Sequence, residues 1–208
     1  MRERLSVWKA LPVRQRWMIV LLALGIILGT VKSPYPAVAP LHHVPTVFVV
    51  FVAPWLLRRW PLSDGAVAAI LVFLLLHTLG GRYTYSNVPY DQFFGFSITE
   101  TFGFRRNHYD RLVHVAFGVL AIAPMREILT RHAGFSRAAS FYGAISFVLS
   151  VSALYEIFEW LLTIVVAGPT ADAYNGQQGD IWDSQKDMAL LALAAFLTAG
   201  WQAFRGKR

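Results

Sequence analysis

Cysteine is absent from this chain of 208 residues, and charged residues are few. Without cysteine there is no disulfide framework, no thiolate metal site and no cysteine nucleophile. Only 15% of the residues are charged, whereas 56% are hydrophobic. A soluble domain has about a quarter of its residues charged and under half apolar. The apolar excess is too large for one water-soluble core, so we expect an integral membrane protein.

The apolar residues fall into six continuous runs, each close to the length of about 20 residues that a bilayer-spanning helix needs. The runs are rich in Leu, Ala and Val and lack the two-residue alternation of membrane barrel strands. The sequence therefore predicts an all-α fold, a single transmembrane helical bundle over residues 1–208. The predicted spans cover residues 16–32, 40–57, 64–81, 108–129, 138–166 and 184–204.

The distribution of charge predicts the orientation of this bundle. With both chain ends in the cytoplasm, the segments on that side hold thirteen basic residues and three acidic ones, a net charge of +10. The rest of the chain holds six basic and nine acidic residues, a net charge of −3. This asymmetry follows the positive-inside rule, so the formal charge of +7 reflects membrane topology and we expect no nucleic-acid partner.

Ionisable residues inside or beside the spans gather at one membrane depth. In the six-span topology, the end of the third span, the start of the fourth, the end of the fifth and the start of the sixth all lie at the outer face. The ionisable residues at these four helix ends are His77, Asp110, His114, Glu156, Glu159, Asp183 and Asp187.

The spacing of these residues favours convergence. Asp110 and His114 are four residues apart and share one helix face, and the same spacing separates Asp183 from Asp187. An unpaired carboxylate inside a bilayer costs a few kcal/mol or more. The excess of acids must therefore be compensated by retained protons, by deep water or by a cation. Oxygen and imidazole ligands without thiolates suit a divalent metal ion, whose identity the residues leave open.

The leading hypothesis is an outer-face active site that acts on a lipid-linked or amphipathic envelope substrate and holds a divalent cation. Glu159 would either orient a metal ligand or act as general base, because a metal site needs an oriented outer shell and a proton acceptor. The predicted metal ligands are His77, Asp110, His114, Glu156, Asp183 and Asp187.

Two other functions remain open. A proton- or cation-coupled transporter would use the carboxylates as relays, and a non-catalytic membrane adaptor would need them only as a buried polar network between helices. Single residues also have simpler possible roles. Asp180 fits a helix N-cap, and the sole role of His77 could be a hydrogen bond to a carbonyl group at a helix end. His42 and His43, at the start of the second span, are left out of the predicted site.

Two loops join the last four spans. The loop 82–107 is rich in tyrosine and phenylalanine, which suits a segment that lies at the membrane interface and covers the polar cluster. The loop 168–182 contains YNGQQGD, whose glycines and amides favour a tight turn before the sixth span.

Four segments of this part of the chain, in order, are GGRYTYSNVPY, NHYDRLVH, SALYEIFEW and GDIWDSQKDM. They resemble the YjdF-like family of bacterial inner-membrane proteins, a domain of unknown function, over about residues 64–200. The layout of Asp110, His114, Glu156, Asp183 and Asp187 is also similar to that of the wider VanZ-like membrane proteins. The resemblance implies a multi-pass protein of the bacterial inner membrane, with membrane lipid as its surroundings, and implies no mechanism.

Reporter fusions test the six-span topology. A reporter at the C-terminus should read cytoplasmic and one inserted within residues 85–100 should read external, because the basic segments then stay inside. An external C-terminus would contradict the topology and would scatter the predicted cluster over both faces.

Overall fold

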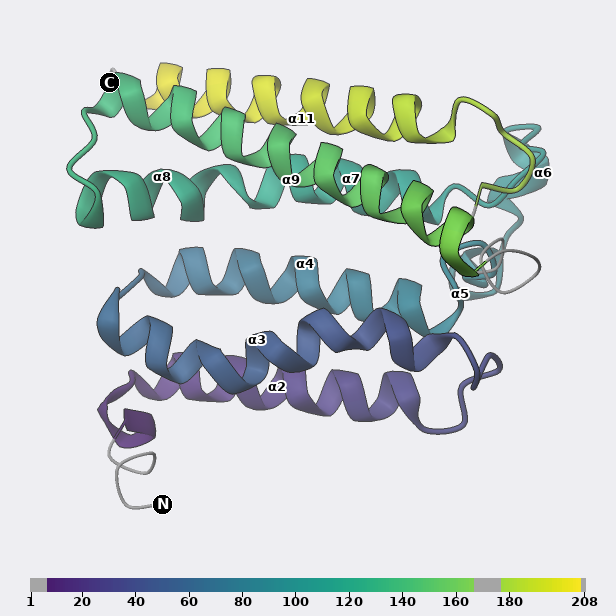
Figure 1. The fold of residues 1–208 in the computed structure, drawn as a ribbon, viewed down its shortest axis with the longest axis horizontal. Coiled ribbons are helices and arrows are strands. Elements are labelled where there is room, and N and C mark those ends of the chain that lie inside the picture. Colours follow the sequence, from purple (N-terminus) through teal and green to yellow (C-terminus); the bar gives the residue numbers. More distant parts are fainter. Residues whose placement is uncertain (1–6, 167–176, 207–208) are drawn as a thin grey trace.

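The protein folds into a bundle of long helices (Figure 1), seen in a computed structural model that describes residues 7–166 and 177–206. Within these residues the chain forms helices and connecting turns and no strand, as predicted. Six spans are long and apolar enough to cross a membrane, one of them built from two helices. The long helices are α2 (Val13–Thr30), α3 (Ala39–Arg59), α4 (Asp64–Arg82), α7 (Tyr109–Leu120), α8 (Ile122–His132), α9 (Arg137–Val166) and α11 (Asp183–Arg205).

The fourth span, predicted as one helix, is divided at Ala121 into α7 and α8. The cause lies in Pro124, whose nitrogen has no hydrogen to donate to the carbonyl group of Leu120. The bonds on either side persist, since Ala121 N donates to Phe117 O and Met125 N donates to Ala121 O. The span thus keeps its direction with a local break at mid-depth.

The helices form two halves. Helices α2, α3 and α4 pack on one another, and α7, α8, α9 and α11 make up the second half. Helix α4 joins them, because it packs against both α7 and α8. In the second half, buried small and branched residues of α8, α9 and α11 form a core of Ile122, Ala144, Val148, Leu191, Ala195 and Ala199.

Hydrogen bonds fix the line of contact between the halves at both ends. At one end Ser63, the N-cap of α4, donates through its backbone N–H and its hydroxyl to the two carboxylate oxygens of Glu127 in α8, each at 2.6 Å. At the other end the Tyr109 hydroxyl of α7 donates to Leu76 O of α4 at 3.0 Å. Helix α4 is therefore held to the second half along its length.

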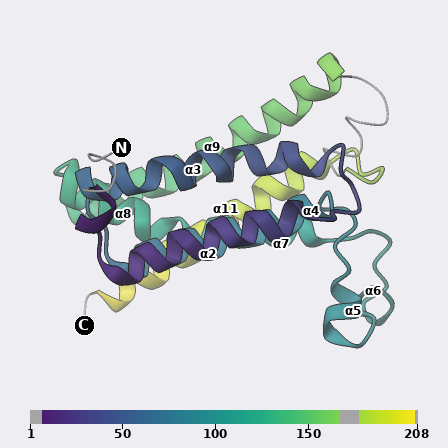
Figure 2. The same ribbon diagram turned by 90° about the horizontal axis from the view of Figure 1, so that it is seen from below.

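The beginning of α2 and the end of α11 lie at the same end of the bundle, as an even number of spans requires (Figure 1). The opposite end, called the site end below, carries the end of α4 and the beginnings of α7 and α11. Two short helices in the aromatic loop, α5 (Tyr90–Phe94) and α6 (Ile98–Thr101), project from this end, and the second half of α9 diverges from the bundle (Figure 2). Most of the predicted loop 168–182, with the start of YNGQQGD, lies outside the described residues.

A glycine decides how closely α7 approaches α11. A Cβ atom added at buried Gly118 would lie 2.5 Å from Leu191 O, a backbone atom that cannot turn away. We expect Gly118→Ala to destabilise the protein by about 1–3 kcal/mol, the usual cost of overpacking. The measurement is thermal unfolding of the detergent-purified protein.

Gly200→Ala, on exposed α11 surface with no atom within 4 Å of the added Cβ, is the matched control. It should leave stability unchanged or raise it slightly, since alanine is the better helix former. Equal effects of the two substitutions would contradict the close approach of α7 to α11.

Candidate functional site

Four buried ionisable side chains meet at the site end. Asp110 and His114 come from the first two turns of α7, Glu156 from the second half of α9 and Asp187 from the second turn of α11. They are called the acid–histidine cluster below. Each side chain lies within a membrane span, where neighbouring helices and not water surround it.

The cluster is tight enough for one ion. Asp110, His114 and Asp187 each offer one ligand atom, and these atoms all lie within 4.8 Å of one another. His114 Nε2 lies 3.4 Å from Glu156 Oε1 and 3.7 Å from Asp110 Oδ1. Ligand atoms about 2.0–2.2 Å from a zinc ion are separated by roughly 3–4 Å, so the spacing fits a shared cation.

Two oxygens in the cluster lack hydrogen bonds. Glu156 Oε1 and Asp187 Oδ1 are buried, and no donor in the described part of the chain bonds to either. A buried carboxylate oxygen without a donor is expensive in free energy, because its hydration is lost without replacement. These two oxygens are the ones that a cation or a proton would satisfy.

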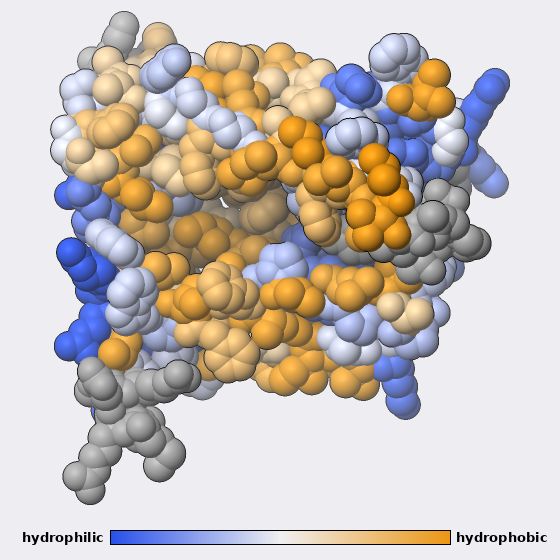
Figure 3. Space-filling model, in the orientation of Figure 1, coloured by the Kyte–Doolittle hydropathy of each residue, from blue (hydrophilic) through white to orange (hydrophobic). Residues whose placement is uncertain are grey.

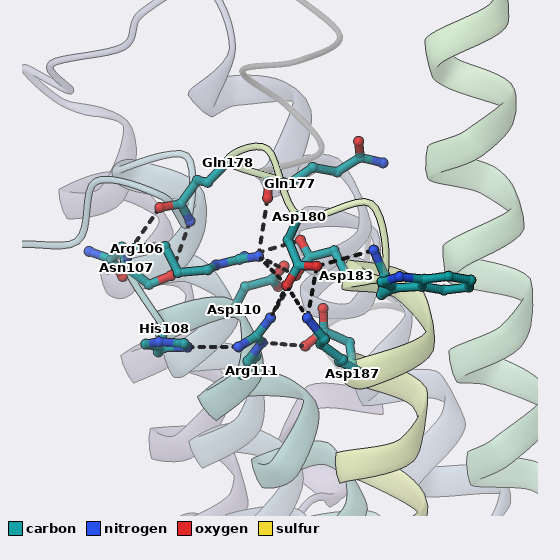
Figure 4. Close-up of polar contacts among 12 residues, drawn as sticks. Arg106, Asn107, His108, Asp110, Arg111, Gln177, Gln178, Asp180, Asp183 and Asp187 are labelled. Carbon is teal, nitrogen blue, oxygen red and sulfur yellow. Dashed lines mark hydrogen bonds and ion pairs between the residues drawn. The ribbon is translucent and has the colours of Figure 1, made fainter. Parts of the chain in front are cut away.

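A second layer of charges covers the cluster toward the end of the bundle (Figure 4). Arg106 donates two hydrogen bonds to the Asp183 carboxylate, one of them at 3.1 Å, and Arg111 Nη2 donates to Asp180 Oδ2 at 2.7 Å. Lys186 Nζ donates to both oxygens of Asp180, at 2.8 and 2.7 Å. Arg106, Arg111, Asp180, Asp183 and Lys186 are called the outer ion network below.

The charges of the outer ion network fix the protonation of Asp180 and of the neighbouring His108. The hydrogen bond from Lys186 lowers the pKa of Asp180 to about 2, with help from the Trp182 N–H group and Arg111, so Asp180 is ionised at neutral pH. Burial lowers the pKa of His108, and the charges of Arg111 and Arg106 lower it further. Neutral His108 then accepts a hydrogen bond at Nδ1 from Arg111 Nη1 at 3.1 Å.

Hydrogen bonds beside the outer ion network hold two loops together. The Asn107 N–H group donates to Gln178 Oε1 at 2.9 Å, and Gln178 Nε2 donates to Asn107 O at 3.0 Å. Arg106 Nη1 also donates to Gln177 O at 3.1 Å. The segment before α7 is thereby held to the segment before α11, which aligns Asp110 with Asp187 (Figure 4).

His77 and Tyr85 face the cluster across a cavity of about 250 Å³ that Asp110 and His114 also line. His77 Nε2 donates to His42 O at 2.8 Å, and the Tyr85 hydroxyl donates to His77 Nδ1. Tyr85 follows Thr84, and both are buried with left-handed φ angles of 56° and 53°. Non-glycine residues in this region store backbone strain, which functional sites often hold.

The predicted site residues thus separate into groups. The structure brings Asp110, His114, Glu156 and Asp187 together, whereas Asp183 pairs with Arg106 and Arg111 in the outer ion network. Both ring nitrogens of His77 are engaged by His42 O and Tyr85. Glu159 lies one turn beyond Glu156 and accepts a hydrogen bond from Tyr155.

Two residues at the site end have contacts that the sequence did not predict. Asp180 as a helix N-cap is wrong: α11 begins at Asp183 after Trp182 and has no side-chain cap, and Asp180 Oδ1 accepts the Trp182 N–H group within the preceding turn at 3.1 Å. His42, which was not included in the predicted site, is buried, and its carbonyl oxygen accepts a hydrogen bond from His77.

Arg106 and Tyr85 are site residues that sequence reasoning missed. Arg106 had a readable signal, since it stands four residues before Asp110 in RRNHYDR and an acid-rich cluster needs cations. Tyr85 had none beyond its place in an aromatic loop. With Arg106 included, the acid–histidine cluster, Glu159 and the outer ion network together hold six acids against three bases, namely Asp110, Glu156, Glu159, Asp180, Asp183 and Asp187 against Arg106, Arg111 and Lys186.

Removing the Arg106 charge tests the outer ion network. We expect Arg106→Gln to destabilise the protein by about 1–3 kcal/mol, because buried Asp183 loses a two-point partner while Arg111 remains at 3.3 Å. Thermal unfolding in detergent measures the effect. Adding Asp183→Asn should recover part of the loss, since the uncompensated charge is then removed.

Arg105→Gln is the matched control, because Arg105 directly precedes Arg106 and its own side chain is exposed. It should change stability by less than about 0.5 kcal/mol. If Arg105→Gln and Arg106→Gln behave alike, the network does not stabilise the site end.

Comparison with known proteins gives a family and a relative. Residues 14–208 match the family described as "Predicted membrane protein (DUF2238)". The chain is 35% identical over 155 residues to "Inner membrane protein YjdF" of Escherichia coli (strain K12), an alignment that covers 74% of this chain and 72% of the relative. No solved structure matches. These findings confirm the predicted resemblance to the YjdF-like family and the inner-membrane localisation, and the chain belongs to the DUF2238 family of predicted membrane proteins.

Proposed function

We propose that the acid–histidine cluster is a divalent metal centre that acts on a lipid-linked or amphipathic substrate of the cell envelope. One observation carries the proposal: the ligand atoms of Asp110, His114 and Asp187, drawn from two helices, lie within 4.8 Å of one another inside the membrane. Glu156, 3.4 Å from His114, supplies a fourth ligand from a third helix.

The chemistry of the donors supports a cation. Three carboxylates and one imidazole suit zinc, manganese or iron, and the absence of cysteine argues against a soft-metal site. A divalent ion would offset most of the excess negative charge and would occupy the positions facing Glu156 Oε1 and Asp187 Oδ1, which lack donors among the described residues. A bound metal ion polarises a substrate oxygen or activates a water molecule.

The surrounding residues have defined tasks in this proposal. Glu159, one turn from Glu156, accepts a proton as general base and is oriented by its bond from Tyr155. Tyr85 and His77 bind the substrate from the opposite wall of the cavity. Asp183 acts from the rim, because it holds the arginines that keep bulk water from the cluster.

A second candidate function is cation- or proton-coupled transport. The break at Ala121 favours it, because interrupted helices often line transport pathways. Against transport, the break lies seven residues, nearly two turns, beyond His114, and the cluster lies near the beginnings of α7 and α11 instead of at mid-depth. Flux of labelled cations into proteoliposomes under an imposed gradient would identify a carrier, which the metal-centre proposal does not require.

Neutral isosteres test the metal centre. Asp187→Asn and Glu156→Gln should each lower the metal content of detergent-purified protein severalfold and abolish function, because an amide keeps the shape and removes a negative ligand. Chelator should destabilise the wild type and have little effect on either variant. The measurements are elemental analysis and thermal unfolding, with and without chelator.

Glu100→Gln, an exposed acid of the aromatic loop, is the control and should keep wild-type metal content. A buried polar scaffold predicts the opposite pattern: no metal in the wild type, no chelator effect, and amide variants that are as stable or more stable, since a buried charge is lost. That pattern would rule out the metal centre.

A further inference from the structure

Two cavities between the halves of the bundle meet end to end. The cavity of about 250 Å³ beside the acid–histidine cluster has Val49 of α3 and Leu74 of α4 in its wall. A second cavity of about 490 Å³ has the same two side chains in its wall and continues toward the opposite end, where Trp60 and His132 line it. The two cavities together are called the trough below.

The trough runs along the depth of the bilayer. Its lining on α4 extends from Val67 to His77, ten residues or about 15 Å at the helical rise, which is half of the hydrocarbon core. In the space-filling view a hollow with a hydrophobic lining opens between the half that holds α9 and the half that holds α3 (Figure 3). Side chains on the flanking helices, such as Phe51 and Leu154, are exposed where lipid surrounds the protein.

The polarity of the lining differs between the two ends of the trough and determines which end a polar head group can occupy. The larger cavity is lined by aliphatic side chains of α2, α3, α4 and α8, and the His132 imidazole at its end already bonds Pro61 O at 3.0 Å. A polar head group would lose its hydration there without gaining partners. The polar groups stand at the other end, where Asp110, His114 and the His77–Tyr85 pair lie. The ligand must therefore be an amphiphile with its head at the site end.

We propose that the trough binds one hydrocarbon chain of a membrane amphiphile, which enters sideways from the bilayer between α3 and α9 with its polar head at the acid–histidine cluster. The occupant is a lipid chain because the trough opens at hydrocarbon depth and its lining is apolar everywhere except at the site end. The position of the head group rests on the proposed function, whereas the chain site rests on the trough alone.

Photolabelling tests the chain site. The full-length protein is reconstituted in vesicles that contain a phospholipid with a diazirine at the end of one acyl chain, and labelled residues are identified by mass spectrometry. We expect labels on trough residues such as Leu57, Ile70 and Leu71. Leu74→Trp, which fills the junction of the two cavities, should reduce this labelling about tenfold, the loss expected when a few methylene groups are displaced.

Val72→Trp is the matched control, because Val72 lies on the same helix with its side chain 46% exposed to lipid. It should leave trough labelling unchanged. If Leu74→Trp does not fold, Val49→Phe narrows the same junction from α3 and should reduce the labelling in the same direction. Labels confined to outward-facing residues such as Phe51 and Leu154, or equal labelling in all variants, would overturn the proposal.

Metal content of the same samples separates this inference from the proposed function. A chain site beside a metal centre gives a Leu74→Trp protein with wild-type metal content and little trough labelling. Trough labelling in a wild type without metal would leave the chain site standing and remove the metal centre. A wild type that contains metal but shows no trough labelling would support the metal centre and rule out the chain site.

Discussion

The cost of buried carboxylates governs the arrangement of the site end. At this depth neighbouring helices replace water as the solvent of Asp110, Glu156 and Asp187, so each charge must find a partner within the protein or bring one in. The chain compensates Asp180 and Asp183 with two arginines and a lysine. The remaining acids stand around one imidazole, and Arg111 Nε lies 3.9 Å from Asp187 Oδ1; two carboxylate oxygens have no hydrogen-bond donor among the described residues. The need to compensate these charges explains why the loops that supply Arg106 and Gln178 are bonded to each other and to Asp183.

Most of the fold could be predicted from the sequence, because a span needs only a long apolar run. The six predicted spans match the helices to within three residues at each end. The break at Ala121 was missed because apolarity continues across it, although Pro124 removes the donor for Leu120 O. The short helices of the aromatic loop were missed because they depend on local caps, such as Ser97 on the Glu100 N–H group at 3.0 Å, and not on apolarity.

The candidate site was predictable where helical spacing controls it. Asp110 and His114 share a face because they are four residues apart, and the shared membrane depth brings Glu156 and Asp187 to them. The partners of Asp183 and His77 were not predictable in the same way. Arg106 and Tyr85 reach them from loops, and the position of Tyr85 depends on left-handed backbone angles that no periodic pattern encodes.

The two halves of the bundle are joined along the contact line of α4 with α7 and α8. Ser63 donates to Glu127 at one end of this line, and Tyr109 donates to Leu76 near the other end. These bonds lie along α4, whereas the hollow opens between α3 and α9. A rotation of one half about this single line of attachment would widen the hollow and leave those bonds in place, so sideways entry of a lipid chain would not require the halves to separate.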